Sequence, residues 1–217
     1  MNLDIKVISF DLDGVLFDGR SATYPVAKAL GLEEQFLSVL RLNAEKQLSL
    51  KESIREGCKI WAGVPVDGTL DHIIETMPLM NGVEETLALL KEWDYKIGCI
   101  SSGVSQFFLK PLTKRLDLDF AFSNQLGETN GTHDGTVHYI MGAAQKAETA
   151  LKYLESIGLT SQNLASIGDG ENDIPIFTVS QFSIAFNPES ERVSMAASLT
   201  INSKDLRSIL PHFIPVD

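Results

Sequence analysis

An apolar run near the start of the chain, Ile5 to Phe10, ends abruptly in the sequence Asp11-Leu12-Asp13-Gly14. The run predicts a β-strand, and because Asp and Gly are poor strand residues, the strand is expected to end here. Side chains alternate along an extended segment, which places Asp11 and Asp13 on the same side of the chain. Two carboxylates that face one small region repel each other. The sequence therefore predicts a compensating group, such as a cation, at this turn.

Short apolar runs alternate with segments of helical periodicity along most of the chain. The predicted strands are Ile5–Phe10, Ile97–Ser101, Leu164–Ile167, Phe182–Ala185 and Leu199–Ile201. Helical spacing is carried by Val83, Leu87 and Leu90 and by Ala147, Leu151 and Leu154. Asn81 with Glu84 resembles a capping box, and Gly158 is a candidate helix stop. This alternation predicts an α/β fold, a Rossmann-like and mostly parallel sheet with helices on both faces.

Two segments break the alternation. Between about residues 20 and 80 there is no convincing strand, and apolar residues recur at helical spacing, which predicts a helical insertion after the first strand. Residues 124–139 are rich in Gly, Asn and Thr, which is typical of a hairpin or flap. We therefore expect residues 1–15 and 81–217 to form an α/β core and residues 16–80 to form a separate helical unit.

The charge balance excludes several classes of partner. The chain of 217 residues carries 29 acidic and 18 basic side chains, a formal net charge of −11. No lysine-arginine run stands out, so neither a nucleic acid nor an acidic membrane surface is expected as the main partner. No segment approaches the roughly 20 apolar residues that a membrane span requires. These features are typical of a soluble cytoplasmic protein.

Polar residues follow two further predicted strands. Ser101, Ser102 and Gly103 end one strand, Gly168 to Asp173 (GDGEND) follow another, and Lys146 lies near the start of the helix between them. In an open parallel sheet the carboxyl ends of the strands form the ligand site. Several carboxylates around one crevice call for a cation, and hard oxygen ligands suit Mg²⁺. A carboxylate beside Mg²⁺ can attack phosphorus, while a second carboxyl two residues on transfers protons.

In this order the residues resemble the four motifs of the haloacid dehalogenase superfamily, and the match spans nearly the whole chain. The GDGEND motif, the helical insertion and residues 184–190 (IAFNPES) resemble its phosphoserine phosphatase-like branch most. The resemblance implies a small helical cap at residues 16–80 that closes over the substrate. It also implies a Mg²⁺-dependent phosphatase that hydrolyses a small phosphorylated metabolite through an aspartyl-phosphate intermediate.

The resemblance also implies a role for each motif residue. Asp11 would be the nucleophile and Asp13 the general acid and base. Mg²⁺ would be held by Asp11, by Asp13 through its carbonyl group and by Asp169, with Asp173 in support. The phosphoryl group would be bound by Ser101 or Ser102, Lys146 and Asn172.

Two positions that would contact the rest of the substrate carry other residues than in the phosphoserine phosphatase-like branch. Phosphoserine phosphatases carry a glutamate shortly after the first motif, where this chain has Arg20, and a cap arginine, where the best match is Gly57. Arg20 would repel an ammonium group, and Gly57 leaves a carboxylate unpaired. The two positions predict that phosphoserine is a poor substrate and make Arg20 a candidate specificity residue.

Three functions remain open from the sequence. The first is the phosphatase, with phosphoserine phosphatase proper as its variant. The second is a phosphomutase or phosphotransferase on the same scaffold, and the third is a binding module without catalysis. Retention of Asp13 favours an enzyme, because a site that only binds has no need of a proton shuttle. The oligomeric state is open as well.

Overall fold

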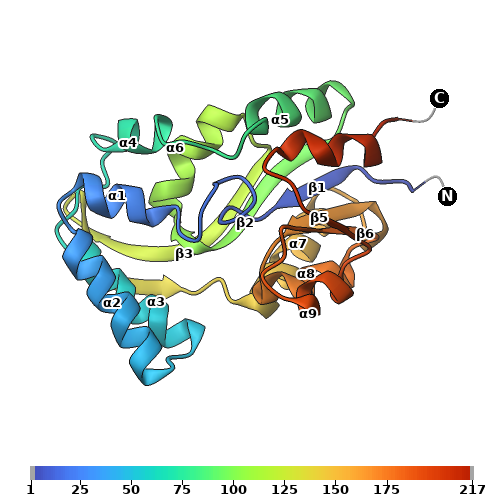
Figure 1. The fold of residues 1–217 in the computed structure, drawn as a ribbon. Coiled ribbons are helices and arrows are strands. Elements are labelled where there is room, and N and C mark those ends of the chain that lie inside the picture. Colours follow the sequence, from blue (N-terminus) through green and yellow to red (C-terminus); the bar gives the residue numbers. More distant parts are fainter. Residues whose placement is uncertain (1–2, 216–217) are drawn as a thin grey trace.

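A seven-stranded sheet organises the chain in the computed structural model, which describes residues 3–215 (Figure 1). The strands are β1 (Val7–Phe10), β2 (Lys96–Ser105), β3 (Phe120–Thr129), β4 (Thr132–Tyr139), β5 (Leu164–Gly168), β6 (Phe182–Phe186) and β7 (Leu199–Ile201). Their order in the sheet is β4-β3-β2-β1-β5-β6-β7. Every neighbouring pair is parallel except the β3–β4 hairpin. The expected mostly parallel α/β fold is confirmed.

Helices cover both faces of the sheet (Figure 1). On one face lie α5 (Val83–Glu92), α6 (Gln106–Leu116) and the 3₁₀ helix η4 (Leu206–His212), and on the other lie α7 (Ala143–Ser156), α8 (Ile174–Val179) and α9 (Glu191–Ala196). Each face has its own buried apolar cluster. β1 contributes to both, through Ile8 and Phe10 on one side and Val7 on the other. A strand that is covered on both faces is apolar along its whole length, which explains the short apolar runs in the sequence.

Two local expectations are wrong. Asn81 and Glu84 form no capping box: α5 begins after Gly82, which has a φ of +73°, and no side chain caps it. Leu151 was expected on the buried face of α7 with Ala147 and Leu154, but it is 37% exposed. The hairpin expected at residues 124–139 is present as β3 and β4.

The insertion after β1 is helical. It contains α1 (Thr23–Ala29), α2 (Glu33–Lys46), α3 (Leu50–Cys58), the 3₁₀ helix η1 (Lys59–Trp61) and α4 (Asp71–Glu75). The first three helices stand beyond one end of the sheet, next to the hairpin (Figure 1). The Cys58 thiol donates to the Gly135 carbonyl, and Pro65 bridges to Thr132, so the hairpin contacts the insertion. α4 packs instead on α6 of the core, and the division at residues 15 and 80 stays a prediction.

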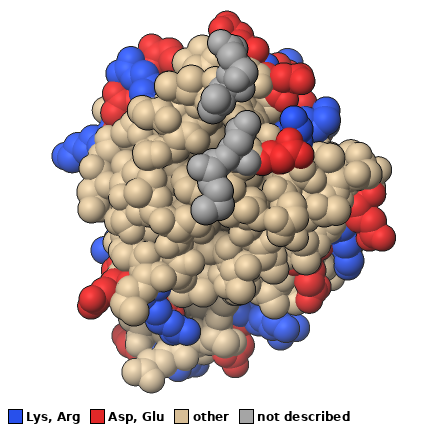
Figure 2. Space-filling model, turned by 90° about the vertical axis from the view of Figure 1, so that its right-hand side faces the viewer, with Lys and Arg blue, Asp and Glu red and all other residues tan. Residues whose placement is uncertain are grey.

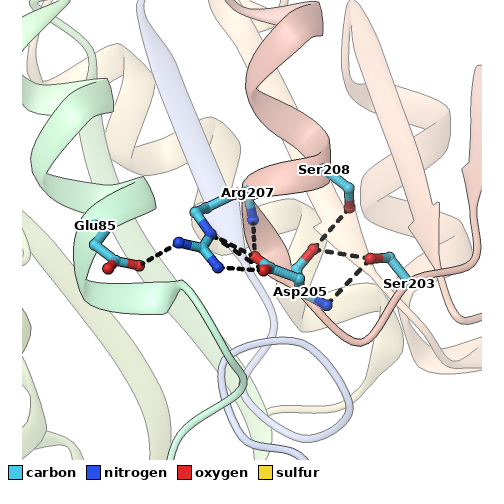
Figure 3. Close-up of polar contacts among 5 residues, drawn as sticks. All are labelled: Glu85, Ser203, Asp205, Arg207 and Ser208. Carbon is cyan, nitrogen blue, oxygen red and sulfur yellow. Dashed lines mark hydrogen bonds and ion pairs between the residues drawn. The ribbon is translucent and has the colours of Figure 1, made fainter.

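The C-terminal segment is fastened to the start of α5 by a polar network (Figure 3). Arg207 binds Asp205 at 2.5 Å and reaches Glu85 of α5 at 3.4 Å. The Leu206 amide donates to the Asn81 carbonyl at 2.8 Å. A Cβ on Gly82 would lie 2.4 Å from the Asp205 carboxylate, which explains why glycine stands at this turn. Because the ion pairs are exposed, we assign most of the fastening to the buried Leu206 and Ile209 beneath them.

The start of β1 and the end of η4 lie at the end of the molecule opposite the helical insertion. On this face basic and acidic side chains are interspersed around the rim (Figure 2). Among residues 3–215, no helix has both the length and the apolar character needed to cross a membrane.

Candidate active site

Three strand ends meet at the middle of the sheet. β1 lies between β2 and β5, with Phe10 paired to Cys99 on one side and to Ile167 on the other. The residues that follow Phe10 therefore emerge beside the end of β2 and beside the GDGEND turn. The Asp11 amide still donates to the Ile167 carbonyl at 2.8 Å. The sheet register thus brings the separate sequence motifs to one place.

Lys146 is the cation at the centre of this site. Its side chain is 1% exposed, and its Nζ lies 2.9 Å from Asp11 Oδ1 and 2.7 Å from Asp173 Oδ1. Lys146 is held there because α7 begins at Ala143 behind the strand ends, which makes it a first-turn residue that points inward. The other oxygen of Asp173 accepts the amides of Asp169 and Gly170, each at 3.1 Å. Asp173 therefore fixes both the lysine and the turn after β5.

Asp11, Asp169 and Asp173 form a cluster that fits a metal ion. Each offers a carboxylate oxygen, and these oxygens lie within 4.8 Å of one another. Within the described chain no hydrogen-bond donor reaches the Asp169 carboxylate, which leaves it open as a ligand. Gly14 permits this approach: its φ is +74°, and a Cβ there would lie 2.0 Å from Asp169 Oδ2. Hard carboxylate oxygens around one point, with one lysine to balance them, suit Mg²⁺.

Asp13 is only partly buried, whereas Asp11 is buried. Its Oδ1 accepts the Ala22 amide at 2.6 Å, and a Cβ on Gly103 would lie 2.1 Å from its Oδ2. The Ser101 hydroxyl is fully buried on the same side and accepts the Gly103 amide at 3.1 Å. The Asp13 carboxylate is thus held by a hydrogen bond from the start of the insertion and by close packing against the end of β2.

Burial dominates the electrostatics of these groups. It raises the pKa of Asp11 well above the usual value, with a further rise from Asp173 that Lys146 opposes. Burial raises the pKa of Asp13 to about 6, although the Ala22 amide and Lys146 both lower it. Burial and the charge of Asp173 raise the pKa of Asp169 to about 7. Burial lowers the pKa of Lys146, but Asp11 and Asp173 outweigh it and the pKa is raised. One lysine cannot neutralise this group of carboxyls, so the site favours an added dication.

The remaining predicted residues are spread around the centre. Ser102 is 5% exposed and lines a cavity beneath the insertion, whereas the Ser101 hydroxyl accepts the Gly103 amide. Asn172 follows the turn after β5 and folds its side chain back towards Gly170. Arg20 is exposed and does not belong to the described lining of the cavity.

Sequence reasoning missed two residues that shape the site. The buried Asn124 amide group donates to the carbonyls of Ser102 and Val104, and its oxygen accepts the Met141 amide, which fastens β2 to the hairpin. His133 of β4 is buried in the cavity wall. Both depend on contacts between distant segments. Only the polar character of residues 124–139 signalled them.

Comparisons with known proteins agree with this geometry. Residues 5–178 match the family model of haloacid dehalogenase-like hydrolases. The phosphoserine phosphatase of Archaeoglobus fulgidus is 29% identical over 86% of this chain and 54% of its own length. That of Saccharomyces cerevisiae is 31% identical over 94% of this chain and 66% of its own length. The chain thus spans less than two thirds of these curated relatives.

A solved structure is similar over its full length. A phospho-aspartyl intermediate analogue of phosphoserine phosphatase has a TM-score of 0.79 and 27% identity, and the match covers 96% of this chain and 99% of that one. The similarity therefore includes both the sheet and the helical insertion.

Proposed function

The chain belongs to the haloacid dehalogenase-like hydrolases, and we propose that it is a Mg²⁺-dependent phosphatase acting on a small phosphorylated metabolite through an aspartyl-phosphate intermediate. The observation that carries this proposal is the buried Lys146 bridging Asp11 and Asp173, with the open Asp169 carboxylate beside them. Such a site holds an anion-binding lysine, a nucleophile and metal ligands within one hydrogen-bonded group.

Asp11 is the proposed nucleophile. Its Oδ1 is held by Lys146 and by the Leu12 amide, which leaves the other carboxylate oxygen to attack phosphorus. A new bond forms between that oxygen and phosphorus while the bond from phosphorus to the substrate alcohol breaks. Mg²⁺, held by Asp11, Asp169 and the Asp13 carbonyl and supported by Asp173, would supply charge neutralisation for the phosphoryl oxygens. Lys146, Ser101, Ser102 and Asn172 would orient these oxygens.

Asp13 is the proposed general acid and base. Because its pKa is raised to about 6, it holds a proton more readily than an ordinary aspartate. It gives that proton to the departing alcohol oxygen and later takes one from the water that attacks the phosphoenzyme. Inorganic phosphate then leaves and the Asp11 carboxylate is restored. The Ala22 amide keeps Asp13 in place through both steps.

A generic phosphate ester tests the proposal. The purified protein is expected to hydrolyse p-nitrophenyl phosphate with Mg²⁺ present, to lose this activity in EDTA and to regain it in excess Mg²⁺. Absence of turnover at any Mg²⁺ concentration would contradict the proposal. Addition of a small alcohol as acceptor distinguishes a phosphotransferase, because the phosphoryl group would then pass to the alcohol instead of to water.

Gly103→Ala is expected to lower kcat for p-nitrophenyl phosphate by about a hundredfold, on the scale of a general acid's contribution. The new Cβ would lie 2.1 Å from Asp13 Oδ2, so the carboxylate must move from its position under the Ala22 amide. Since Asp169 and Asp173 are not displaced, Mg²⁺ affinity by calorimetry should change little. Unchanged kcat would mean that the position of Asp13 is not critical.

Phosphoserine is the second candidate substrate, because the relatives carry that activity in their names. Arg20 and Gly57 stand where that substrate would need an acid and an arginine, and so the sequence predicts poor turnover. We also propose that residues 16–80 act as a cap over the substrate. A cytoplasmic location stays a prediction.

A further inference from the structure

A cavity of about 330 Å³ lies under the helical insertion. Apolar side chains from α1, α2, α3 and η1 form most of its wall, among them Val26, Phe36, Val39, Ile54 and Trp61. Phe36 and Trp61 are both half-buried and line this space. A cavity of this volume corresponds to roughly ten water volumes.

The cavity reaches residues that adjoin the proposed reaction centre. Its floor includes Ser102 and Gly103 of β2 and Ser21 of the insertion. Gly103 lies against the Asp13 carboxylate, and the residue after Ser21 donates its amide to that carboxylate. An alcohol that leaves phosphorus and takes a proton from Asp13 therefore departs from the floor of this cavity. The wall above must accommodate the body of the substrate.

Among the described residues, those that line the cavity include almost no charged side chains. The described wall contains no Lys or Arg, and Asp71 of α4 is its one carboxylate. Arg55 of α3 is exposed and lies outside the described wall, as does Arg20. A substrate carboxylate placed here would lose its hydration without gaining a cation, which is strongly unfavourable. The cavity thus disfavours the charged part of an amino acid.

Buried polar groups in the wall lack partners within the protein. His133 is 4% exposed, and its Nδ1 accepts the Gly135 amide at 2.8 Å, so the neutral ring carries its hydrogen on Nε2. Burial, opposed in part by Asp134, lowers the pKa of His133, which favours this neutral form. No group of the described chain accepts from Nε2 or donates to Asn43 Oδ1. The Ser102 hydroxyl of this cavity also lacks a partner in the described chain, and it is assigned above to the phosphoryl group. One donor and one acceptor then remain in the wall, which match a neutral polar group on a ligand.

We propose that the substrate of this site is a phosphomonoester of an uncharged, largely apolar alcohol that carries at most one neutral polar group. The inference rests on the proposed phosphatase function and narrows it. The apolar body lies between Phe36, Val39 and Trp61, and His133 Nε2 donates to the neutral group. The phosphoryl group lies at Asp11.

Matched alkyl esters test this inference, because their alcohols leave with comparable difficulty. Turnover of benzyl phosphate, ethyl phosphate and O-phospho-L-serine is measured with Mg²⁺. We expect kcat/KM for benzyl phosphate to exceed that for ethyl phosphate by roughly tenfold to a hundredfold, on the scale that an apolar pocket provides. We expect phosphoserine to fall below both. Phosphoserine at or above benzyl phosphate overturns the inference but leaves the phosphatase intact, whereas no turnover of any ester overturns the phosphatase itself.

Variants of the wall provide the second readout. Trp61→Ala is expected to reduce the preference for benzyl over ethyl phosphate by about tenfold, because it removes apolar contact that only the larger substrate makes. If Trp61→Ala does not fold, the smaller change Val39→Ala is used instead, and it is also expected to reduce the preference for benzyl over ethyl phosphate. Leu151→Ala, on the solvent side of α7, should leave the preference unchanged. A preference that neither wall variant alters contradicts the assignment of the cavity.

Discussion

Asp11→Asn is expected to lower kcat for p-nitrophenyl phosphate by at least about a thousandfold, since removal of a nucleophile costs this much or more in other enzymes. The amide has almost the shape of the carboxylate but cannot form an acyl phosphate. Its oxygen can still accept from Lys146 and the Leu12 amide, so the site should keep its arrangement. The residual rate is measured at saturating substrate and Mg²⁺.

The same variant should fold at least as well as the parent at neutral pH. Burial and Asp173 raise the pKa of Asp11, so its ionised form is unfavourable in the folded protein without metal. Removal of that charge takes away repulsion from Asp173, and the melting temperature in EDTA should therefore not fall. Full activity would exclude Asp11 as the nucleophile, while a collapsed melting transition would point to a structural role. A loss of turnover with the fold retained also separates an enzyme from a binding module, which has no turnover to lose.

Much of the fold follows from sequence patterns with a simple physical origin. Strands such as β1 were predictable, because a strand covered on both faces is apolar throughout. The start of α5 was not predictable, because Gly82 has a positive φ and packs closely against Asp205, which is far away in the sequence. Leu151 has the correct helical spacing, yet it is 37% exposed, whereas Ala147 and Leu154 are buried. These errors come from contacts between distant segments.

The centre of the site was predictable for a different reason. Asp11, Asp169 and Asp173 follow strand ends, and parallel strands deliver such residues to one edge of the sheet. The wall of the cavity could not be predicted, because it depends on how the helical insertion packs against the β3–β4 hairpin. His133 is an ordinary strand residue in the sequence and becomes notable only once burial leaves its Nε2 without a partner. The reacting groups are thus encoded locally, whereas the substrate pocket arises from packing between distant parts.

Lys146→Met is expected to lower the free energy of unfolding by about 3–5 kcal/mol at pH 8 in EDTA, the usual cost of breaking a buried ion pair by removal of one partner. Lys146 is 1% exposed and neutralises both Asp11 and Asp173, so methionine keeps most of the volume but leaves two buried carboxylates without a cation. Lys152→Met, on the exposed side of the same helix, is the matched control and should cost little. Urea unfolding of both variants gives the comparison.

The loss in Lys146→Met should depend on pH in a defined direction. Lys146 lowers the pKa of Asp11, so without it that pKa rises further above its unfolded value. A carboxyl with a raised folded pKa adds stability below its unfolded pKa, and this contribution is lost as the pH rises through the folded pKa. The deficit relative to the parent should therefore be larger at pH 8 than at pH 5. It should also shrink in the Asp11→Asn background, where one of the two carboxylates is already gone. Equal deficits under all these conditions would mean that the lysine acts through packing rather than charge.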